Sequence, residues 1–224
     1  IVKNYNADMV LFTEIGMSAH TLTLALARMA PIQALIAGHP CTSGMKSIDY
    51  FVSSELVECP GNQQFYTEQL VLLTTFPSTM KFPSLPEKIL SRTEMGLPES
   101  QVVIGFPHSL FKLHPDFDQI LETIAKRNKN VRFIFVNSPN QYLAELVQKR
   151  WINNAPSILS HSIFLDPMPL KRFLMLLSNL DFILDPLYFG SGTVFMHSMA
   201  VGTPIVSMPV VQMRSRITLG GYRM

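Results

Sequence analysis

Residues 185–193 have the sequence DPLYFGSGT and decide the fold more than any other stretch of the chain. An apolar run before them, Phe182–Leu184, predicts a strand, and the run Thr193–Val201 after them predicts a helix. A glycine-rich turn between a strand and a helix leaves backbone N–H groups unpaired at the positive end of the helix dipole. Such a turn can bind phosphate, although Gly190-x-Gly192 lacks a third glycine and also suits an ordinary strand-to-helix turn.

The rest of the second half continues this alternation of apolar runs and amphipathic stretches. Strands are expected at 102–106, 131–136, 162–165, 182–184 and 204–208, and helices at 115–127, 141–151, 170–178 and 193–201. Strands that alternate with helices in this way indicate a parallel sheet with crossover helices. Such sheets bind ligands at the carboxyl ends of their strands, where the strand order reverses.

The first half has a similar pattern. Strands are expected at 9–13, 32–37, 50–53 and 70–73, and a helix at 19–29. Four prolines between residues 76 and 100 interrupt regular structure and indicate a linker. We therefore expect an α/β protein with a first domain at 1–76, a linker at 77–100 and a second domain at 101–224. Because the pattern is already under way at Ile1 and still continues at Met224, we expect the first domain to lack its beginning and the second its end.

The composition excludes several classes of function. Of 224 residues, 47% are apolar and 15% are charged, which suits a buried core rather than a disordered chain. The net charge of +2 and the absence of a Lys/Arg run argue against a nucleic-acid surface. Charged or polar residues interrupt both of the most apolar stretches, 22–37 and 173–184, so no membrane span is expected. Two cysteines are too few for a disulfide framework, and we expect a cytoplasmic location.

Two further loops follow predicted strands. Residues 106–115, FPHSLFKLHP, place Lys112 at the carboxyl edge of the second sheet, where it can bind a pyrophosphate or remain a solvated loop lysine. A charge-assisted hydrogen bond from such a lysine contributes about 1.5–3 kcal/mol. His108 and His114 are more typical of loop or capping residues than of ligands. Residues 38–44, GHPCTSG, have short polar side chains that suit a hydroxylated ligand or a tight turn.

Two other pairs of residues resemble known kinds of site without fitting them. Asp116-x-Asp118 could hold a divalent metal, but it follows Pro115 at the start of a predicted helix, where acidic side chains cap N–H groups and favour the dipole. We prefer this helix-start interpretation. Cys41 and His39 are neighbours, yet no partner pattern supports a thiol nucleophile, and no zinc-type spacing occurs. No metal is expected.

Several short stretches, taken in order, carry a resemblance to a known family. They are EIGM at 14–17, APIQA at 30–34, GHPCTSG at 38–44, IDYF at 48–51, SLFKLHPDF at 109–117, LDFILDP at 180–186, FGSG at 189–192 and GTPIV at 202–206. With this order and spacing, the chain resembles the O-GlcNAc transferase/SPINDLY family of glycosyltransferases, especially its bacterial members. The resemblance runs through nearly all of the chain.

The resemblance implies a GT-B-type enzyme with two Rossmann-like domains and an active site in the cleft between them. It implies transfer of a sugar, GlcNAc from UDP-GlcNAc, to Ser or Thr hydroxyls of proteins, with no metal or other cofactor besides the nucleotide-sugar co-substrate. Tetratricopeptide repeats commonly precede this region in the family and are expected upstream. Another donor, such as GDP-fucose or UDP-glucose, stays open, and so does a non-catalytic remnant that binds nucleotide or peptide. A nucleotide-sugar epimerase shares the architecture, but we find no acids and bases at matching positions.

The resemblance also implies roles for individual residues. The residues expected at the donor diphosphate are Lys112, Ser109, Gly192, Thr193 and Val194, with Lys112 neutralising the charge. Those expected at the base and ribose are Met168, Pro169, Leu170, Phe173, whose ring would stack on the base, and His197. Those expected near the sugar and the acceptor are Gly38, His39 and Thr42, with His39 a candidate participant in catalysis. His197 replaces an acid that usually contacts the ribose, and Ser109 and Val194 replace other polar groups.

Overall fold

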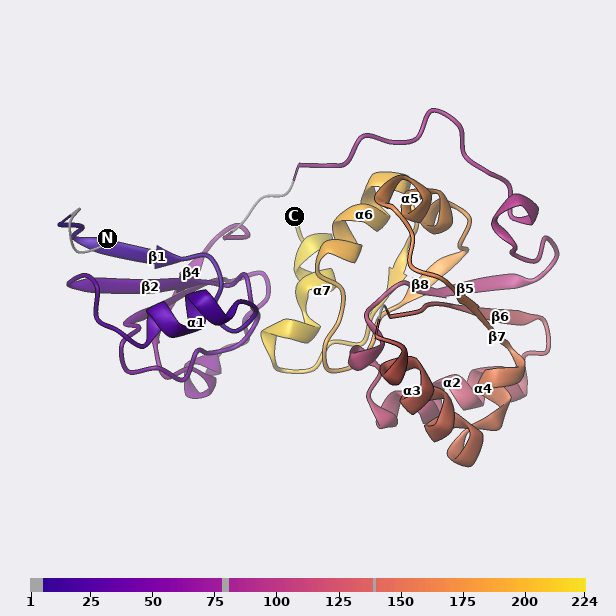
Figure 1. Cartoon of the computed structure of the whole chain (residues 1–224), viewed down its shortest axis with the longest axis horizontal. Helices are drawn as coiled ribbons and strands as arrows, with labels where there is room; N and C mark the ends of the chain where they lie inside the picture. The colour runs from indigo at the N-terminus through magenta and orange to yellow at the C-terminus, as the bar shows by residue number, and fades with distance from the viewer. Residues whose placement is uncertain (1–5, 78–80, 139) are drawn as a thin grey trace. The chain divides into compact units, whose positions relative to one another are not determined.

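A computed structural model describes residues 6–77, 81–138 and 140–224. The chain forms two compact units, each described here by itself. The first unit combines the N-terminal residues, up to 80, with Val210–Met224, and the second comprises Lys81–Pro209 (Figure 1).

The first unit is built on a four-stranded parallel sheet in the order β1-β2-β3-β4. Its elements are β1 Met9–Phe12, α1 Ala19–Ala25, β2 Ile32–Ile36, β3 Tyr50–Ser54, the 3-10 helix η2 Asn62–Phe65 and β4 Gln69–Leu73. The core consists of buried apolar residues from these elements, from the loops between them and from the C-terminal segment: Phe12, Ile15, Ala25, Leu35, Ile48, Phe51, Val57 and Met213. All four predicted strands are therefore present, each within one residue of its expected bounds.

Helix α1 ends at Ala25, four residues before its predicted end. The cause is the side chain of Gln33, which is fully buried in β2. Its amide oxygen accepts a hydrogen bond from the Met29 backbone N–H at 2.8 Å, and its amide nitrogen donates to the Ala27 carbonyl at 3.2 Å. The backbone after α1 therefore pairs with a side chain from the sheet instead of continuing the helix.

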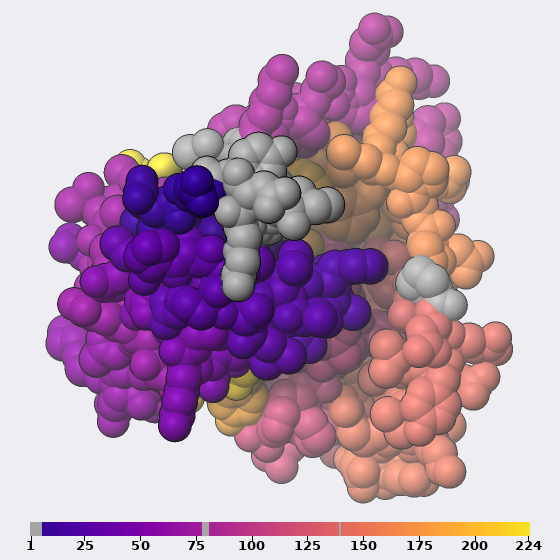
Figure 2. All heavy atoms as spheres, turned by 60° about the vertical axis from the view of Figure 1, so that its left-hand side comes forward, coloured from indigo at the N-terminus to yellow at the C-terminus, as the bar shows by residue number. Residues whose placement is uncertain are grey.

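Part of the surface of the first unit is apolar. The N-terminal residues of the first unit, which include β1 and α1, are indigo in Figure 2. Large side chains that are exposed there include Met9 and Leu11 of β1 and Leu22 and Leu24 of α1.

The C-terminal segment packs on the first unit through long-range contacts. It contains the 3-10 helix η5 Met213–Ser215 and the helix α7 Ile217–Tyr222. The Arg216 guanidinium donates to the Val57 carbonyl at 2.8 Å, and Asn62 donates to the Val211 carbonyl at 3.2 Å. The second domain expected from the sequence, 101–224, included residues 210–224, because position along the chain gives no sign of this return.

The second unit is a five-stranded parallel sheet in the order β7-β6-β5-β8-β9. Its elements are η3 Thr93–Met95, β5 Val102–Phe106, η4 Leu110–Lys112, α2 Pro115–Arg127, β6 Val131–Val136, α3 Gln141–Asn154, α4 Pro156–Ser160, β7 Ser162–Leu165, α5 Leu170–Ser178, β8 Phe182–Leu184, α6 Thr193–Val201 and β9 Ile205–Val206. Figure 1 shows α2, α3 and α4 on one face of the sheet and α5 and α6 on the other. Each face has its own buried apolar cluster, so the sheet is covered on both sides.

The predicted α/β fold with two parallel sheets is confirmed. Strand β9 has two residues rather than the five expected, and the short helix α4 was not predicted. In the described part of the chain, no helix is both long and apolar enough to cross a membrane. The strand order of the second sheet reverses at β5, which has β6 on one side and β8 on the other. The loops after β5 and β8 therefore start side by side, in the position where such sheets bind ligands.

Candidate functional site

Lys112 lies at the point where the loops after β5 and β8 meet. Its Nζ donates to the Gly190 carbonyl at 2.8 Å and lies 4.1 Å from the centre of the Phe189 ring. Burial lowers the pKa of Lys112, and the charge of Asp185 offsets part of that effect. An ammonium group has three N–H donors. With one of them on Gly190, the others are available to oxygen atoms of a ligand.

The two glycines of the turn after β8 have different roles. A Cβ atom on Gly190 would lie 2.7 Å from Oδ2 of the buried Asp185, so only glycine allows this close packing. A Cβ atom on Gly192 would meet nothing within 4 Å, and no side chain caps α6 at this residue. The Phe195 N–H bonds to the Gly192 carbonyl at 3.0 Å, and no side-chain cap from the described residues blocks the N–H groups before it, as a phosphate site at a helix N-terminus requires.

His108, which was expected to be a loop or capping residue, is a buried part of this site. Its Nε2 lies 2.8 Å from the Ser191 hydroxyl and 3.5 Å from Oδ1 of Asp185. The hydroxyl and the backbone N–H of Ser191 donate to the same Oδ1 at 2.8 and 2.6 Å. His108 follows β5 by two residues, and that position was the available signal. His114 does cap a helix, since its Nδ1 accepts from the Asp116 N–H at 3.2 Å.

The residues expected at the base and ribose lie on α5, α6 and the loop before α5. Met168 and Pro169 precede α5, and Leu170 is its first residue. The rings of Phe173 on α5 and His197 on α6 lie edge to face, with centroids 6.0 Å apart. Burial lowers the pKa of His197, which favours the neutral imidazole. The structure thus brings Phe173 and His197 together, and their contacts with a nucleotide remain predictions.

The pair Asp116 and Asp118 has structural partners. Asp118 is buried and accepts from the Arg150 guanidinium at 2.6 and 2.9 Å and from the Trp151 indole N–H at 2.8 Å. Asp116 lies in the first turn of α2 and accepts from the Tyr188 hydroxyl at 2.6 Å. Within the described residues, no group of three or more His, Cys, Asp or Glu side chains is arranged to hold a metal ion. Both acids lie in the first turn of α2, as the helix-start interpretation expects, but their partners are side chains, and the residue that caps the helix is His114.

The loop 38–44 of the first unit is organised by a residue that the sequence analysis missed. Glu68 is buried and accepts hydrogen bonds from the Thr42 hydroxyl at 2.7 Å and from the backbone N–H of Ser43 at 2.8 Å. Burial opposes ionisation of Glu68, but the hydrogen bonds from Ser43 and Thr42 outweigh it and lower the pKa. Gly38 is required by close packing, because a Cβ atom there would lie 2.0 Å from the Thr13 carbonyl oxygen.

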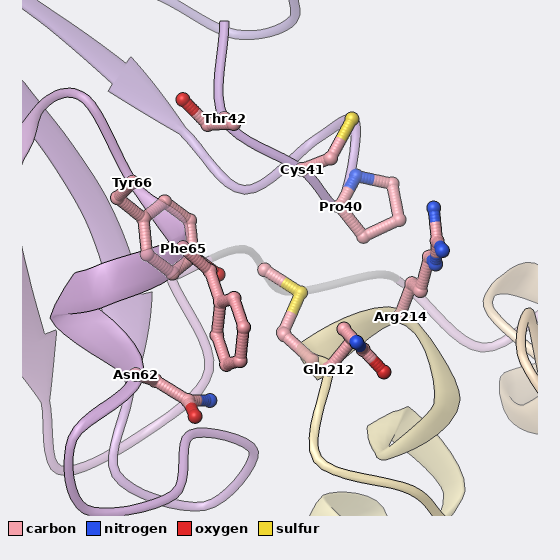
Figure 3. A pocket seen from close by; sticks show the side chains of 9 residues that line it. Pro40, Cys41, Thr42, Asn62, Phe65, Tyr66, Gln212 and Arg214 are labelled. Carbon is pink, nitrogen blue, oxygen red and sulfur yellow. The ribbon is translucent and has the colours of Figure 1, made fainter. Parts of the chain in front are cut away.

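A cavity of about 120 Å³ adjoins this loop in the first unit (Figure 3). Its lining comprises Pro40, Cys41, Thr42, Asn62, Phe65, Tyr66, Gln212, Met213 and Arg214. Burial raises the pKa of the Cys41 thiol, which argues against a nucleophilic thiolate. His39 lies beside Gly16, where a Cβ atom would come within 3.5 Å of the imidazole. Since Gly38, His39 and Thr42 belong to the first unit and Lys112 to the second, their action in one active site stays a prediction.

Comparison with known proteins identifies relatives at low identity. No family model matches the chain. It is 26% identical over its whole length to a UDP-glucose:protein N-β-glucosyltransferase of Actinobacillus pleuropneumoniae, of which it covers 35%. It is 24% identical, over 87% of its length, to the probable UDP-N-acetylglucosamine–peptide N-acetylglucosaminyltransferase SPINDLY of Hordeum vulgare, of which it covers 21%. The chain thus spans about a third or less of these relatives.

Solved structures share the fold. An O-GlcNAc transferase mutant of Thermobaculum terrenum matches 99% of the chain with a TM-score of 0.81 and 21% identity, and the chain covers 42% of it. HepE of Anabaena, solved with UDP and glucose, matches 99% of the chain with a TM-score of 0.53 and 11% identity, and the chain covers 70% of it. The predicted GT-B fold is confirmed by these neighbours. The chain is therefore homologous to the SPINDLY O-GlcNAc transferases and the protein N-β-glucosyltransferases, and it has the GT-B fold of glycosyltransferases.

Proposed function

We propose that this chain supplies the nucleotide-sugar-binding part of a protein glycosyltransferase and that the carboxyl edge of β5 and β8 binds the donor diphosphate. The observation that carries the proposal is the position of Lys112. A half-buried ammonium group is held by the Gly190 carbonyl directly beside the uncapped N-terminus of α6. A cation beside a helix N-terminus that no side chain caps favours an oligophosphate.

The proposed chemistry follows from these groups. An acceptor nucleophile attacks the anomeric carbon of the sugar, the glycosidic bond to the phosphate breaks, and the nucleoside diphosphate leaves with the electron pair. Negative charge then increases on the diphosphate. Lys112 and the N–H groups at Thr193 and Val194 are preorganised donors that stabilise this charge more in the transition state than in the ground state.

For the donor and acceptor, we propose UDP-GlcNAc and protein hydroxyl groups, by analogy with the names of the SPINDLY and SEC relatives. A second candidate is glucosyl transfer from UDP-glucose to a protein nitrogen. One observation favours it: the N-β-glucosyltransferase matches the whole chain, whereas the SPINDLY relative matches 87% of it. Both candidates use a uridine diphosphate sugar, so the diphosphate site is common to them.

Calorimetric titration tests the proposal. The full chain is titrated with UDP, UDP-GlcNAc, UDP-glucose, GDP and GDP-fucose, beside the variants Lys112→Ala and Lys129→Ala. Lys129 is exposed after α2 and serves as the matched control for loss of one positive charge. Removing the lysine should lower the free energy of nucleotide binding by about 1.5–3 kcal/mol, which predicts a Kd about 10- to 150-fold higher for Lys112→Ala. The Kd of Lys129→Ala should equal that of the parent chain. Equal affinity of Lys112→Ala and the parent chain, or no nucleotide binding by a folded parent chain, would refute the diphosphate site.

A further inference from the structure

A buried chain of hydrogen bonds joins the loops after β5 and β8. It runs from the His108 imidazole through the Ser191 hydroxyl to the Asp185 carboxylate, with distances of 2.8 Å at both steps. His108 is 4% exposed, Ser191 0% and Asp185 3%, so solvent does not satisfy any of these groups. Buried polar groups of this kind are retained where they fix one conformation.

The partners determine where the protons lie. Asp185 as a carboxylate can only accept, so both the hydroxyl and the backbone N–H of Ser191 donate to it. The Ser191 oxygen is then left to accept from His108, which places the imidazole proton on Nε2. Nδ1 of His108 is buried and has no hydrogen-bond partner among the described residues, which agrees with a neutral imidazole whose proton is on Nε2.

The neutral form of His108 follows from its surroundings. A second proton on Nδ1 would be a buried donor without an acceptor in the described part of the chain. Burial lowers the pKa of His108, and the charge of Lys112 acts in the same direction, whereas Asp185 opposes it. The imidazole therefore acts as a fixed hydrogen-bond donor.

Ser191 is the link between this chain and the diphosphate site. Its neighbour on one side is Gly190, whose carbonyl holds Lys112, and on the other side Gly192, the N-cap of α6. Glycine is the residue with the greatest conformational freedom, so a turn with two of them needs an anchor. Fixing Ser191 fixes both the carbonyl that orients the lysine and the first N–H groups of the helix.

We propose that His108 is a positioning residue: its Nε2–H holds Ser191, and thereby the Gly190–Gly192 turn, in the conformation that receives a diphosphate. The inference rests on the proposed function of this site. His108 itself does not contact the ligand. Its effect is therefore expected on the phosphate-dependent part of binding and not on the nucleoside.

The test compares UDP with uridine as probes, because the ratio of their Kd values measures the phosphate contribution. The variants are His108→Leu, which removes the donor, and His108→Gln, which retains an N–H donor on a side chain of similar length. His20→Leu, at an exposed position on α1, is the control. We expect the uridine-to-UDP ratio to fall about tenfold in His108→Leu with uridine affinity within about twofold, and to recover largely in His108→Gln.

Ser191→Ala keeps the measurement available if His108→Leu does not fold, because it retains the backbone N–H bond to Asp185. The same fall in the ratio is expected. An unchanged ratio in a folded His108→Leu or Ser191→Ala protein would overturn the proposal, and so would an equal loss of uridine and UDP affinity, which indicates general loosening. Parent protein that binds UDP no more tightly than uridine would overturn the proposed function itself, and this inference with it.

Discussion

Gly190→Ala tests the close packing of the phosphate turn on Asp185. The new Cβ would lie 2.7 Å from Oδ2 and 3.1 Å from Cγ of a carboxylate that is 3% exposed. Carbon and oxygen atoms in contact are normally separated by about 3.3–3.6 Å, so a gap of roughly 0.6 Å must open. Asp185 cannot move by this amount without lengthening its two bonds from Ser191, at 2.6 and 2.8 Å.

The magnitude follows from these contacts. Overpacking a buried site by one methyl group costs about 1–3 kcal/mol, and a hydrogen bond to a charged group contributes about 1.5–3 kcal/mol. The clash is relieved either by strained packing or by a weakened hydrogen bond, so the two costs are not added. We expect a loss of about 2–3 kcal/mol in the free energy of unfolding. For a domain of this size the melting temperature falls by about 3–4 °C per kcal/mol, which gives about 6–12 °C.

Thermal melting followed by circular dichroism measures this change. Gly192→Ala is the matched control, because its Cβ meets nothing within 4 Å, and we expect it to cost about 1 kcal/mol or less. A Gly190→Ala protein that melts within about 2 °C of the parent would refute the packing argument. Equal destabilisation by Gly192→Ala would refute the distinction between the two glycines.

Two further predictions concern stability. Asp118→Ala should lower the free energy of unfolding, measured by urea denaturation, by about 3–5 kcal/mol, because it leaves a guanidinium and an indole N–H without their carboxylate. Asp116→Ala, at the exposed helix start, should change it by about 1 kcal/mol or less. The opposite order would contradict the structural role of the buried acid. Burial lowers the pKa of His108 and His197 below the unfolded value of about 6.5, so the unfolded chain binds more protons as the pH falls through 6.5. The melting temperature should therefore be highest above about pH 6.5 and fall toward pH 5. The fall should be less steep in His108→Gln. A melting temperature that stays constant or rises toward pH 5 would contradict this reasoning.

The sequence predicted the elements of the second unit well. The bounds of β5, α2, β6, β7 and α5 agree with the structure residue for residue, because each has a clear apolar period or a proline at its start. It also predicted the turn at residues 190–193 and the position of Lys112 beside the sheet. The turn follows from its glycines between a strand and a helix, and the position of Lys112 follows from the rule that the loops after parallel strands emerge at the same edge.

Contacts between residues distant in sequence escaped prediction. His108 and Ser191 are 83 positions apart, and they meet only because β8 pairs with β5 rather than with β7. Gln33 ends α1, and Glu68 organises the loop 38–44. The C-terminal segment returns to the first unit. No pattern in the neighbouring sequence indicates any of these contacts.

The division between the features that the sequence predicted and those that only the structure revealed has a physical basis. The period of a helix or strand is a property of the backbone, so a few neighbouring residues reveal it. Strand order instead depends on the packing of all the elements together, and it decides which loops become neighbours. The sequence by itself thus determined the alternation of elements and the lysine and glycines of the candidate site. Only the tertiary structure decided that a buried histidine and an aspartate lie beside them, hydrogen-bonded to Ser191.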